Sequence, residues 1–194
     1  LAGSRLELLD VTSGVVVAKL DSPAGMLAAV AFVGDDAVAS GGADGTIRFW
    51  QRPDFAKTLR RDVDGEVLAL TASADGTLLA VASRGKPVRL WSAGADEPRF
   101  LPPASRGVVG LAASGDGSSL ATGARDGEVT IWGSDDLLAH QHFRAAPGLR
   151  SVAYAADGSR LAAAGDTELR VWTTRAGATS ERRGHSGAVL DVAV

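Results

Sequence analysis

The chain has 194 residues, of which 45% are hydrophobic and 22% charged, a balance typical of a soluble globular protein with a sizeable core. A net charge of −3 and the lack of a charge-free run of about 20 residues argue against nucleic acid or a membrane as partner. The chain contains no Cys, which excludes disulfides and thiolate sites, and we expect it in the cytoplasm.

The predicted strands recur with a period of about 41 residues. Trp residues close short apolar runs at positions 50, 91, 132 and 172, with spacings of 41, 41 and 40, and Leu9 takes the equivalent place one period earlier. A second apolar run opens each period, at residues 27, 67, 108, 149 and 189. In the second full period four such runs occupy residues 67–71, 78–83, 88–91 and 99–101, and all are too short for helices.

Asp-Gly pairs separate the first two apolar runs of three periods, at residues 75–76, 116–117 and 157–158. Asp-Gly between apolar runs is a strong hairpin signal, because the turn requires a positive φ. Each period therefore predicts a unit of four antiparallel strands.

Four strands per period of about 40 residues predict an all-β fold made of β-propeller blades. A single four-stranded blade cannot bury both faces, whereas blades stacked around an axis bury one another. In chain order we expect a partial blade at 1–20, with strands at 5–9 and 15–20, and complete blades at about 26–60, 66–101, 107–143 and 148–183. A partial blade at 184–194, holding one strand at 189–194, ends the single propeller region that spans residues 1–194.

These residues resemble the WD-repeat (WD40) family, through the Trp-terminated strands, the Asp-Gly turns and the pair Gly184-His185. The resemblance implies a hydrogen-bond set within each blade, made by His, Ser or Thr, Asp and Trp. The residues that match its places are Ser40, Asp44, Trp50, Trp91, Thr122, Asp126, Trp132, Asp166, Trp172 and His185. No repeat has the full set, and Gln51, Ser92, Gly133 and Thr173 replace the Asp that usually follows Trp, so these repeats are divergent.

The number of blades in the closed ring stays open. The resemblance favours an excerpt of a larger ring of seven blades. A five-bladed ring, in which the two terminal segments share one blade, is the alternative.

The charged residues divide between two rims of the expected ring. The hairpin rim carries the loops that join strands one to two and three to four; it is acidic and includes Asp35, Asp36, Asp75, Asp116, Asp135, Asp136 and Asp157. The junction rim carries the loops from strand two to three and from blade to blade. Its arginines are candidate partner contacts, since Arg is enriched in interface hot spots: Arg61, Arg84, Arg106, Arg125, Arg144, Arg182 and Arg183. Charge that serves only solubility is the alternative interpretation.

No constellation typical of catalysis is found in the sequence. His140 and His142 alternate on a predicted strand and could share a metal ion, but a third ligand is missing, and an exposed outer strand is the simpler interpretation. The expected channel residues Ala28, Ala29, Ala69, Gly110 and Ser151 are small, and Asp191 is the one acid near them.

We therefore predict a non-enzymatic scaffold or sensor module of a larger regulatory protein, with other proteins or peptides as partners and no cofactor or metal. A propeller enzyme or small-ligand binder that uses the central channel is the alternative. The sequence does not indicate an oligomeric state.

Overall fold

The computed structural model describes residues 4–22, 27–52, 54–55, 57–102, 107–155, 157–166, 168–174, 179–183 and 187–193. Every regular element in these ranges is a strand, which confirms the predicted all-β class. A search of the same residues for a helix that could cross a membrane finds none.

Each full period forms one antiparallel sheet of four strands, paired in chain order. Blade 1 contains β3 (Leu27–Val33), β4 (Ala37–Gly42), β5 (Thr46–Gln51) and β6 (Lys57–Asp62). Blade 2 contains β7 (Val67–Ala72), β8 (Leu78–Ser83), β9 (Arg89–Ser92) and a short outer strand, β10 (Arg99–Phe100).

The same order of strands continues through the second half of the chain. Blade 3 contains β11 (Val108–Ala113), β12 (Ser119–Ala124), β13 (Glu128–Gly133) and β14 (Ala139–Arg144). Blade 4 contains β15 (Leu149–Tyr154), β16 (Arg160–Gly165), β17 (Glu168–Thr173) and β18 (Thr179–Arg183).

Partial blades flank these four sheets. Ahead of them β1 (Ser4–Leu9) pairs with β2 (Val16–Ser22) in a half-blade, where the third and fourth strands of a blade were predicted. Behind them residues 187–193 lie beside blade 4, and the N–H of Val189 donates to the carbonyl of Asp166 at 2.5 Å. The strand predicted at 189–194 is not formed within the described residues: residues 187–193 are extended beside blade 4 but pair with none of its strands.

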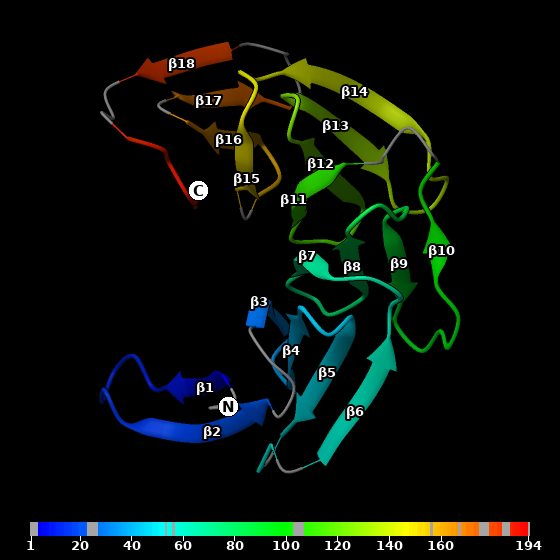
Figure 1. Ribbon diagram of the computed structural model, residues 1–194, viewed down its shortest axis with the longest axis vertical. Helices are drawn as coiled ribbons and strands as arrows, with labels where there is room; N and C mark the ends of the chain where they lie inside the picture. Colours follow the sequence, from blue (N-terminus) through cyan, green and yellow to red (C-terminus); the bar gives the residue numbers. More distant parts are fainter. Residues whose placement is uncertain are drawn as a thin grey trace.

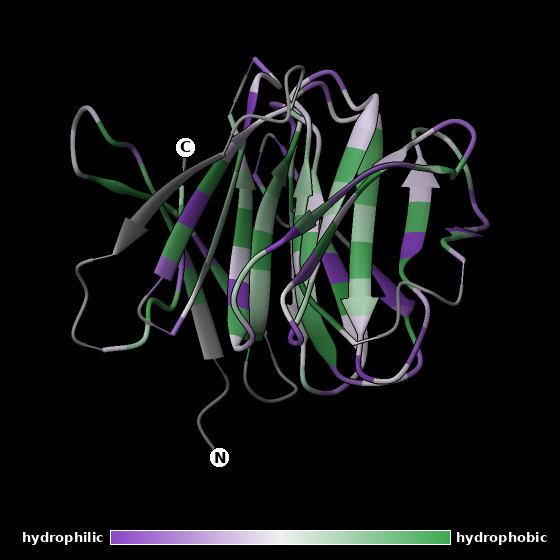
Figure 2. Ribbon diagram, turned by 90° about the horizontal axis from the view of Figure 1, so that it is seen from above, coloured by the Kyte–Doolittle hydropathy of each residue, from purple (hydrophilic) through white to green (hydrophobic). Residues whose placement is uncertain are grey.

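The sheets are arranged around a common centre as an open arc (Figure 1). The first strands β3, β7, β11 and β15 lie nearest the centre, and the fourth strands lie on the outside. The arc is open between the half-blade and residues 187–193. Hydrophobic residues concentrate in the strands and hydrophilic residues in the loops at either end (Figure 2), so the sheets pack against one another and the loops form the two rims.

The hydrophobic core is divided into clusters that lie between neighbouring blades. Alternate side chains of one strand point to opposite faces. Thus Leu78 and Ala80 of β8 pack toward blade 3, whereas Leu79 and Val81 pack toward blade 1. Burial on both faces is why these strands are apolar at almost every position, as the unbroken run at 78–82 predicts.

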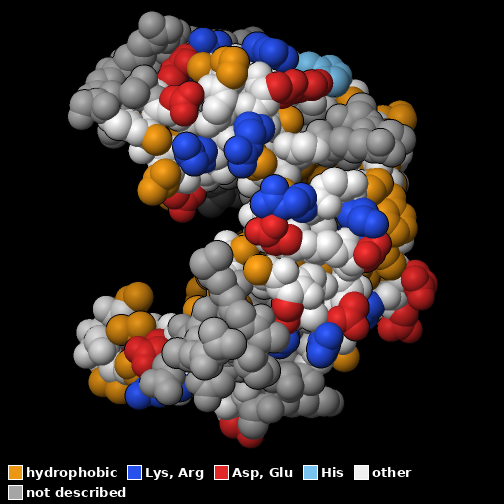
Figure 3. All heavy atoms as spheres, viewed as in Figure 1, with side chains coloured by type: hydrophobic (Ala, Val, Ile, Leu, Met, Phe, Trp, Pro, Cys, Tyr) orange, Lys and Arg blue, Asp and Glu red, His pale blue; other side chains and the backbone are white. Residues whose placement is uncertain are grey.

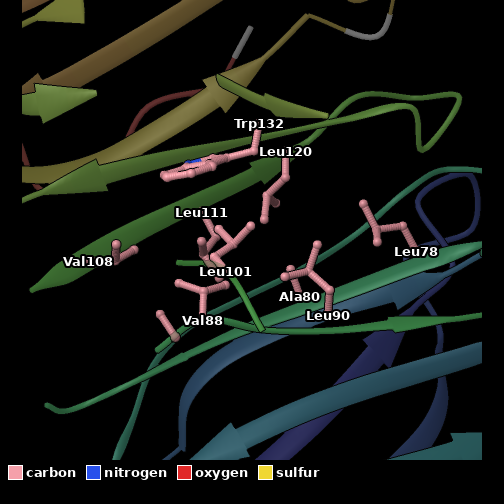
Figure 4. Close-up of a cluster of buried hydrophobic side chains, with 10 residues drawn as sticks. Leu78, Ala80, Val88, Leu90, Leu101, Val108, Leu111, Leu120 and Trp132 are labelled. Atoms are coloured by element: carbon pink, nitrogen blue, oxygen red, sulfur yellow. The ribbon is translucent and has the colours of Figure 1, made fainter. Parts of the chain in front are cut away.

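Each Trp packs against the blade that precedes its own. Trp132 joins Leu90 and Leu101 of blade 2 in the cluster drawn in Figure 4. The other three Trp residues follow the same rule, with Trp50 beside Leu20, Trp91 beside Ile47 and Trp172 beside Val129. The Trp interval in the sequence is therefore the interval between blades, because one indole is placed in each cluster.

Candidate functional site

The Asp-Gly turns on the hairpin rim have the predicted geometry, with φ of 72° at Gly76, 68° at Gly117 and 67° at Gly158. In the turn after β11, Asp116 Oδ1 accepts hydrogen bonds from Ser114 Oγ at 2.7 Å and from Ser118 N at 3.1 Å. The bond from the Ser114 hydroxyl, followed by those from Ser118, holds the pKa of Asp116 below its usual range. The hairpin rim is therefore acidic at neutral pH. Carboxylates such as that of Asp116 accept hydrogen bonds from residues of the same turn and so stabilise it.

A cavity of about 600 Å³ lies on this rim between blades 3 and 4. Its lining includes Asp116, Asp157, His140 and Tyr154. Burial, together with the charge of Asp116, raises the pKa of Tyr154, so its phenol is neutral.

Two of the predicted partner-contact arginines on the junction rim are bound within the protein. The guanidinium of Arg61 contacts the backbone carbonyl of Asp96 and lies 3.7 Å from the Asp96 carboxylate, in the β9–β10 loop of blade 2. This loop joins a third strand to a fourth, so Arg61 turns its charge toward the hairpin rim and not toward the junction rim where it was predicted. Arg84 Nε lies 2.6 Å from Glu66 Oε2. A partner would have to compete with these contacts, so Arg61 and Arg84 are weaker candidates than the sequence indicates.

Arg125 and Arg144 are exposed, and neither side chain makes a hydrogen bond or ion pair with the residues that the structure describes. Arg106 lies outside the described residues, and of Arg182 and Arg183 only the backbone, in β18, is described. On the face turned to the viewer in Figure 3, Lys and Arg side chains gather near the inner edge of the arc. On the junction rim, the positive charge that is not paired within the described residues therefore lies on blade 3 and at its junction with blade 4, at Arg125 and Arg144.

A central cavity of about 570 Å³ opens among the first strands of the blades. It is lined by the predicted channel residues Ala28, Ala29, Ala69, Gly110, Ser151 and Asp191. Asp191 is bound at 2.5 Å by the hydroxyl of Ser151.

The sequence reasoning missed Arg150, the one cationic side chain that the described part of the chain contributes to this lining. The signal is visible when the first strands are aligned, because Arg150 takes the place of Ala28, Leu68 and Val109.

The hydrogen bond that the family resemblance implies between Trp and a hydroxyl is present in blade 3. Trp132 Nε1 donates to Thr122 Oγ1 at 2.9 Å, and both side chains are buried. In blade 2 the equivalent place holds Val81, and the buried Nε1 of Trp91 has no hydrogen-bond partner among the described residues. In blade 1 the Ser40 hydroxyl is buried, and no described residue forms a hydrogen bond with it.

Blade 1 uses its predicted Asp in another way. Asp44 Oδ2 accepts a hydrogen bond from Arg48 at 2.9 Å, and Asp44 Oδ1 accepts one from Thr46 Oγ1 at 2.8 Å. Burial tends to raise the pKa of Asp44, but the hydrogen bonds from Arg48 and Thr46 outweigh it and the pKa is lowered. Arg48 is buried, and nothing in the sequence reasoning had singled it out.

The remaining residues of the implied set have local roles. Asp126 Oδ1 accepts from the N–H of Glu128 at 3.0 Å, and Asp166 has a positive φ of 47°. Trp50 and Trp172 are buried in their clusters. His185 lies outside the described residues.

Exchanging the residues at the two equivalent places should change stability in opposite directions. We expect Val81→Thr to raise the free energy of unfolding by about 0.5–1 kcal/mol, because its hydroxyl supplies the acceptor that Trp91 lacks. Thr122→Val should lower it by about 1–3 kcal/mol, because the Trp132 N–H loses its acceptor. Urea unfolding of both variants checks this, and a loss of stability in both would contradict it.

The two histidines of β14 are exposed, and each contacts a different residue. His140 Nε2 lies 2.9 Å from Asp136 Oδ2, while His142 Nδ1 lies 3.3 Å from Thr130 Oγ1. Over the part of the chain that the structure describes, no group of three or more His, Cys, Asp or Glu side chains could hold a metal ion.

The comparisons with known proteins agree with the repeat. The family model described as "WD domain, G-beta repeat" matches residues 14–51, 99–133 and 137–173, which together exceed half of the chain. Each matched segment begins with the outer strand of one blade and continues with three strands of the next. The residues between the first two matches include most of blade 2, where Val81 replaces the hydroxyl. No curated protein matches the chain.

Proposed function

Since the chain belongs to the WD40-repeat family, we propose that it is a non-enzymatic interaction module, the scaffold or sensor domain of a larger regulatory protein. Its partners in this proposal are other proteins or peptides, and its location is the cytoplasm. Loops held on a rigid frame of strands suit this role, because they can vary without disturbing the core.

The observation that carries the proposal is the unmatched positive charge of the junction rim. Arg125 and Arg144 are exposed and have no side-chain partner among the described residues, whereas Lys86 and Arg84 are matched by Asp64 and Glu66. A free guanidinium can pack and donate several hydrogen bonds at once, which is why Arg is common in binding hot spots. We therefore assign the binding surface to the junction rim near blades 3 and 4.

We expect the double variant Arg125→Ala, Arg144→Ala to bind its partner about tenfold or more weakly, since a hot-spot arginine is worth about 1–2 kcal/mol or more. The measurement compares the proteins captured by the immobilised wild-type chain and by the variant, followed by titration of any protein that differs. The matched control, Arg52→Ala with Arg160→Ala, removes two exposed arginines from the hairpin rim. Equal binding by both variants, or loss in the control alone, would contradict the proposal.

We also propose that further strands complete the half-blade, in keeping with a larger ring. The edge of β1 that faces the centre is unpaired among the described residues, and Val30 and Phe32 of β3 are 52% and 69% exposed. In blades 2, 3 and 4, whose preceding blade is complete, the residues equivalent to Val30 are Leu70, Leu111 and Val152, and all three are buried.

A further inference from the structure

The first strand of every complete blade contains a bulge at the same place. The pairing register shifts between Leu27 and Ala29 of β3, and the shift recurs at residues 67–69, 108–110 and 149–151. The residue left unpaired in each bulge is Ala28, Leu68, Val109 or Arg150. A bulge bends its strand and redirects a side chain, and bulges are frequent beside binding sites.

These four unpaired residues line the central cavity together with Leu190, the residue at the same place in the last apolar run. They come from the beginning of each first strand, which follows a loop of the junction rim, so this end of the cavity is the mouth on that rim. The mouth is apolar over blades 1 to 3, where Leu68 and Val109 are half-buried. Leu190, which follows blade 4, is also apolar and is 72% exposed.

The charge at the mouth is uneven. Arg150 is exposed, and its guanidinium makes no hydrogen bond or ion pair with a described residue. Asp191 is the single acid among the described lining residues, and the Ser151 hydroxyl already donates a hydrogen bond to it at 2.5 Å. On the rim above, Arg125 is also free, and its backbone contacts Gly107 and Gly148 at the entrances to β11 and β15. A ligand in the mouth would therefore contact apolar side chains over blades 1 to 3 and the unpaired guanidinium of Arg150 on blade 4.

From this arrangement we infer that the mouth binds a peptide segment of the partner in which an apolar side chain is flanked by a carboxylate. The apolar side chain covers Leu68 and Val109, and the carboxylate pairs with Arg150. The inference rests on the proposed function, because it names the chemistry of the partner that the junction rim would bind. Basic segments are disfavoured, since their charge would approach Arg150 and Arg125.

Three fluorescent peptides test the inference on the purified chain: Ser-Glu-Leu-Phe-Glu-Ser, its counterpart with Lys for Glu, and its counterpart with Gly-Gly for Leu-Phe. The first should bind about tenfold more tightly than either of the others. Arg150→Glu should reverse the order of the acidic and basic peptides. Leu68→Ser should weaken the acidic apolar peptide by about three- to tenfold, since it removes buried apolar area without opening the core.

Arg160→Glu is the matched control, because it makes the same change of charge at an exposed residue of β16 near the hairpin rim. Equal affinity for the three peptides, no detectable binding of any of them, or the same effect from Arg150→Glu and Arg160→Glu would overturn the inference. If capture of a partner still depends on Arg125 and Arg144 in that case, only the chemistry assigned to the mouth is wrong. If capture does not depend on them, the proposed function fails as well.

Discussion

Replacing Gly127 with Ala is expected to lower the free energy of unfolding by about 3–5 kcal/mol, from backbone strain and overpacking together. Gly127 has a φ of 93°, a conformation that L side chains rarely adopt. A Cβ there would collide with the backbone carbonyl of Ala145 and lie 2.8 Å from that of Ala146. Backbone cannot move aside as a flexible side chain does, and the N–H of Ala145 already bonds the carbonyl of Gly127 at 2.8 Å.

Gly85→Ala separates the two causes. Gly85 lies in the corresponding loop of blade 2 with a φ of 70°, but a Cβ there meets no atom within 4 Å. It should therefore cost only the strain of the positive φ, about 1–2 kcal/mol. Urea unfolding followed by far-ultraviolet circular dichroism gives both values, and equal losses would show that the carbonyls near Gly127 exert no steric effect.

The second large effect is expected at Trp132, which is 4% exposed and joins blades 2 and 3. Trp132→Ala should cost about 3–5 kcal/mol, because it leaves a cavity among Leu90, Leu101 and Leu120. Thermal and urea unfolding measure the loss. A cost below about 1 kcal/mol would mean that the cluster collapses around the missing indole.

Phe variants divide the contribution of Trp132 into packing and hydrogen bonding. Trp132→Phe keeps an aromatic ring but removes the N–H that Thr122 accepts, whereas Trp91→Phe removes an N–H that has no partner. We expect Trp132→Phe to be more costly than Trp91→Phe by about 1 kcal/mol, the net value of a typical hydrogen bond. An equal or larger loss for Trp91→Phe would show that the hydrogen bond in blade 3 adds no stability.

The sequence predicts the blades well because period, turns and burial all give the same signal. The Trp interval, the Asp-Gly turns and the apolar runs such as 78–82 each report a local requirement of a sheet covered on both faces. The bounds of β8 and β11 accordingly lie within a residue or two of the expected runs.

The side-chain contacts were harder to predict, because they depend on which neighbour a long side chain reaches. Arg61 was predicted to be free on the junction rim, but it contacts the β9–β10 loop. Arg150 lies in a strand whose apolar pattern gives no sign that its side chain lines the cavity. The resemblance matched Ser40 to a hydrogen-bonding place, yet its buried hydroxyl has no partner, whereas Asp44 is bound by Arg48. Residue type and spacing do not determine such pairings.

The offset between the sequence repeat and the blade has a consequence for the way such chains change length. Each matched segment starts in the outer strand of one sheet and ends in the third strand of the next. Loss or duplication of one whole period therefore leaves the complete sheets with four strands each, and one indole in the cluster between neighbouring blades, wherever the cut falls. A deletion that removes one or two strands would instead leave a sheet with the wrong number of strands and expose one of these clusters to water. We expect this chain to tolerate recombination in steps of one Trp interval. The number of blades can then change while the packing of each hydrophobic cluster between blades stays the same.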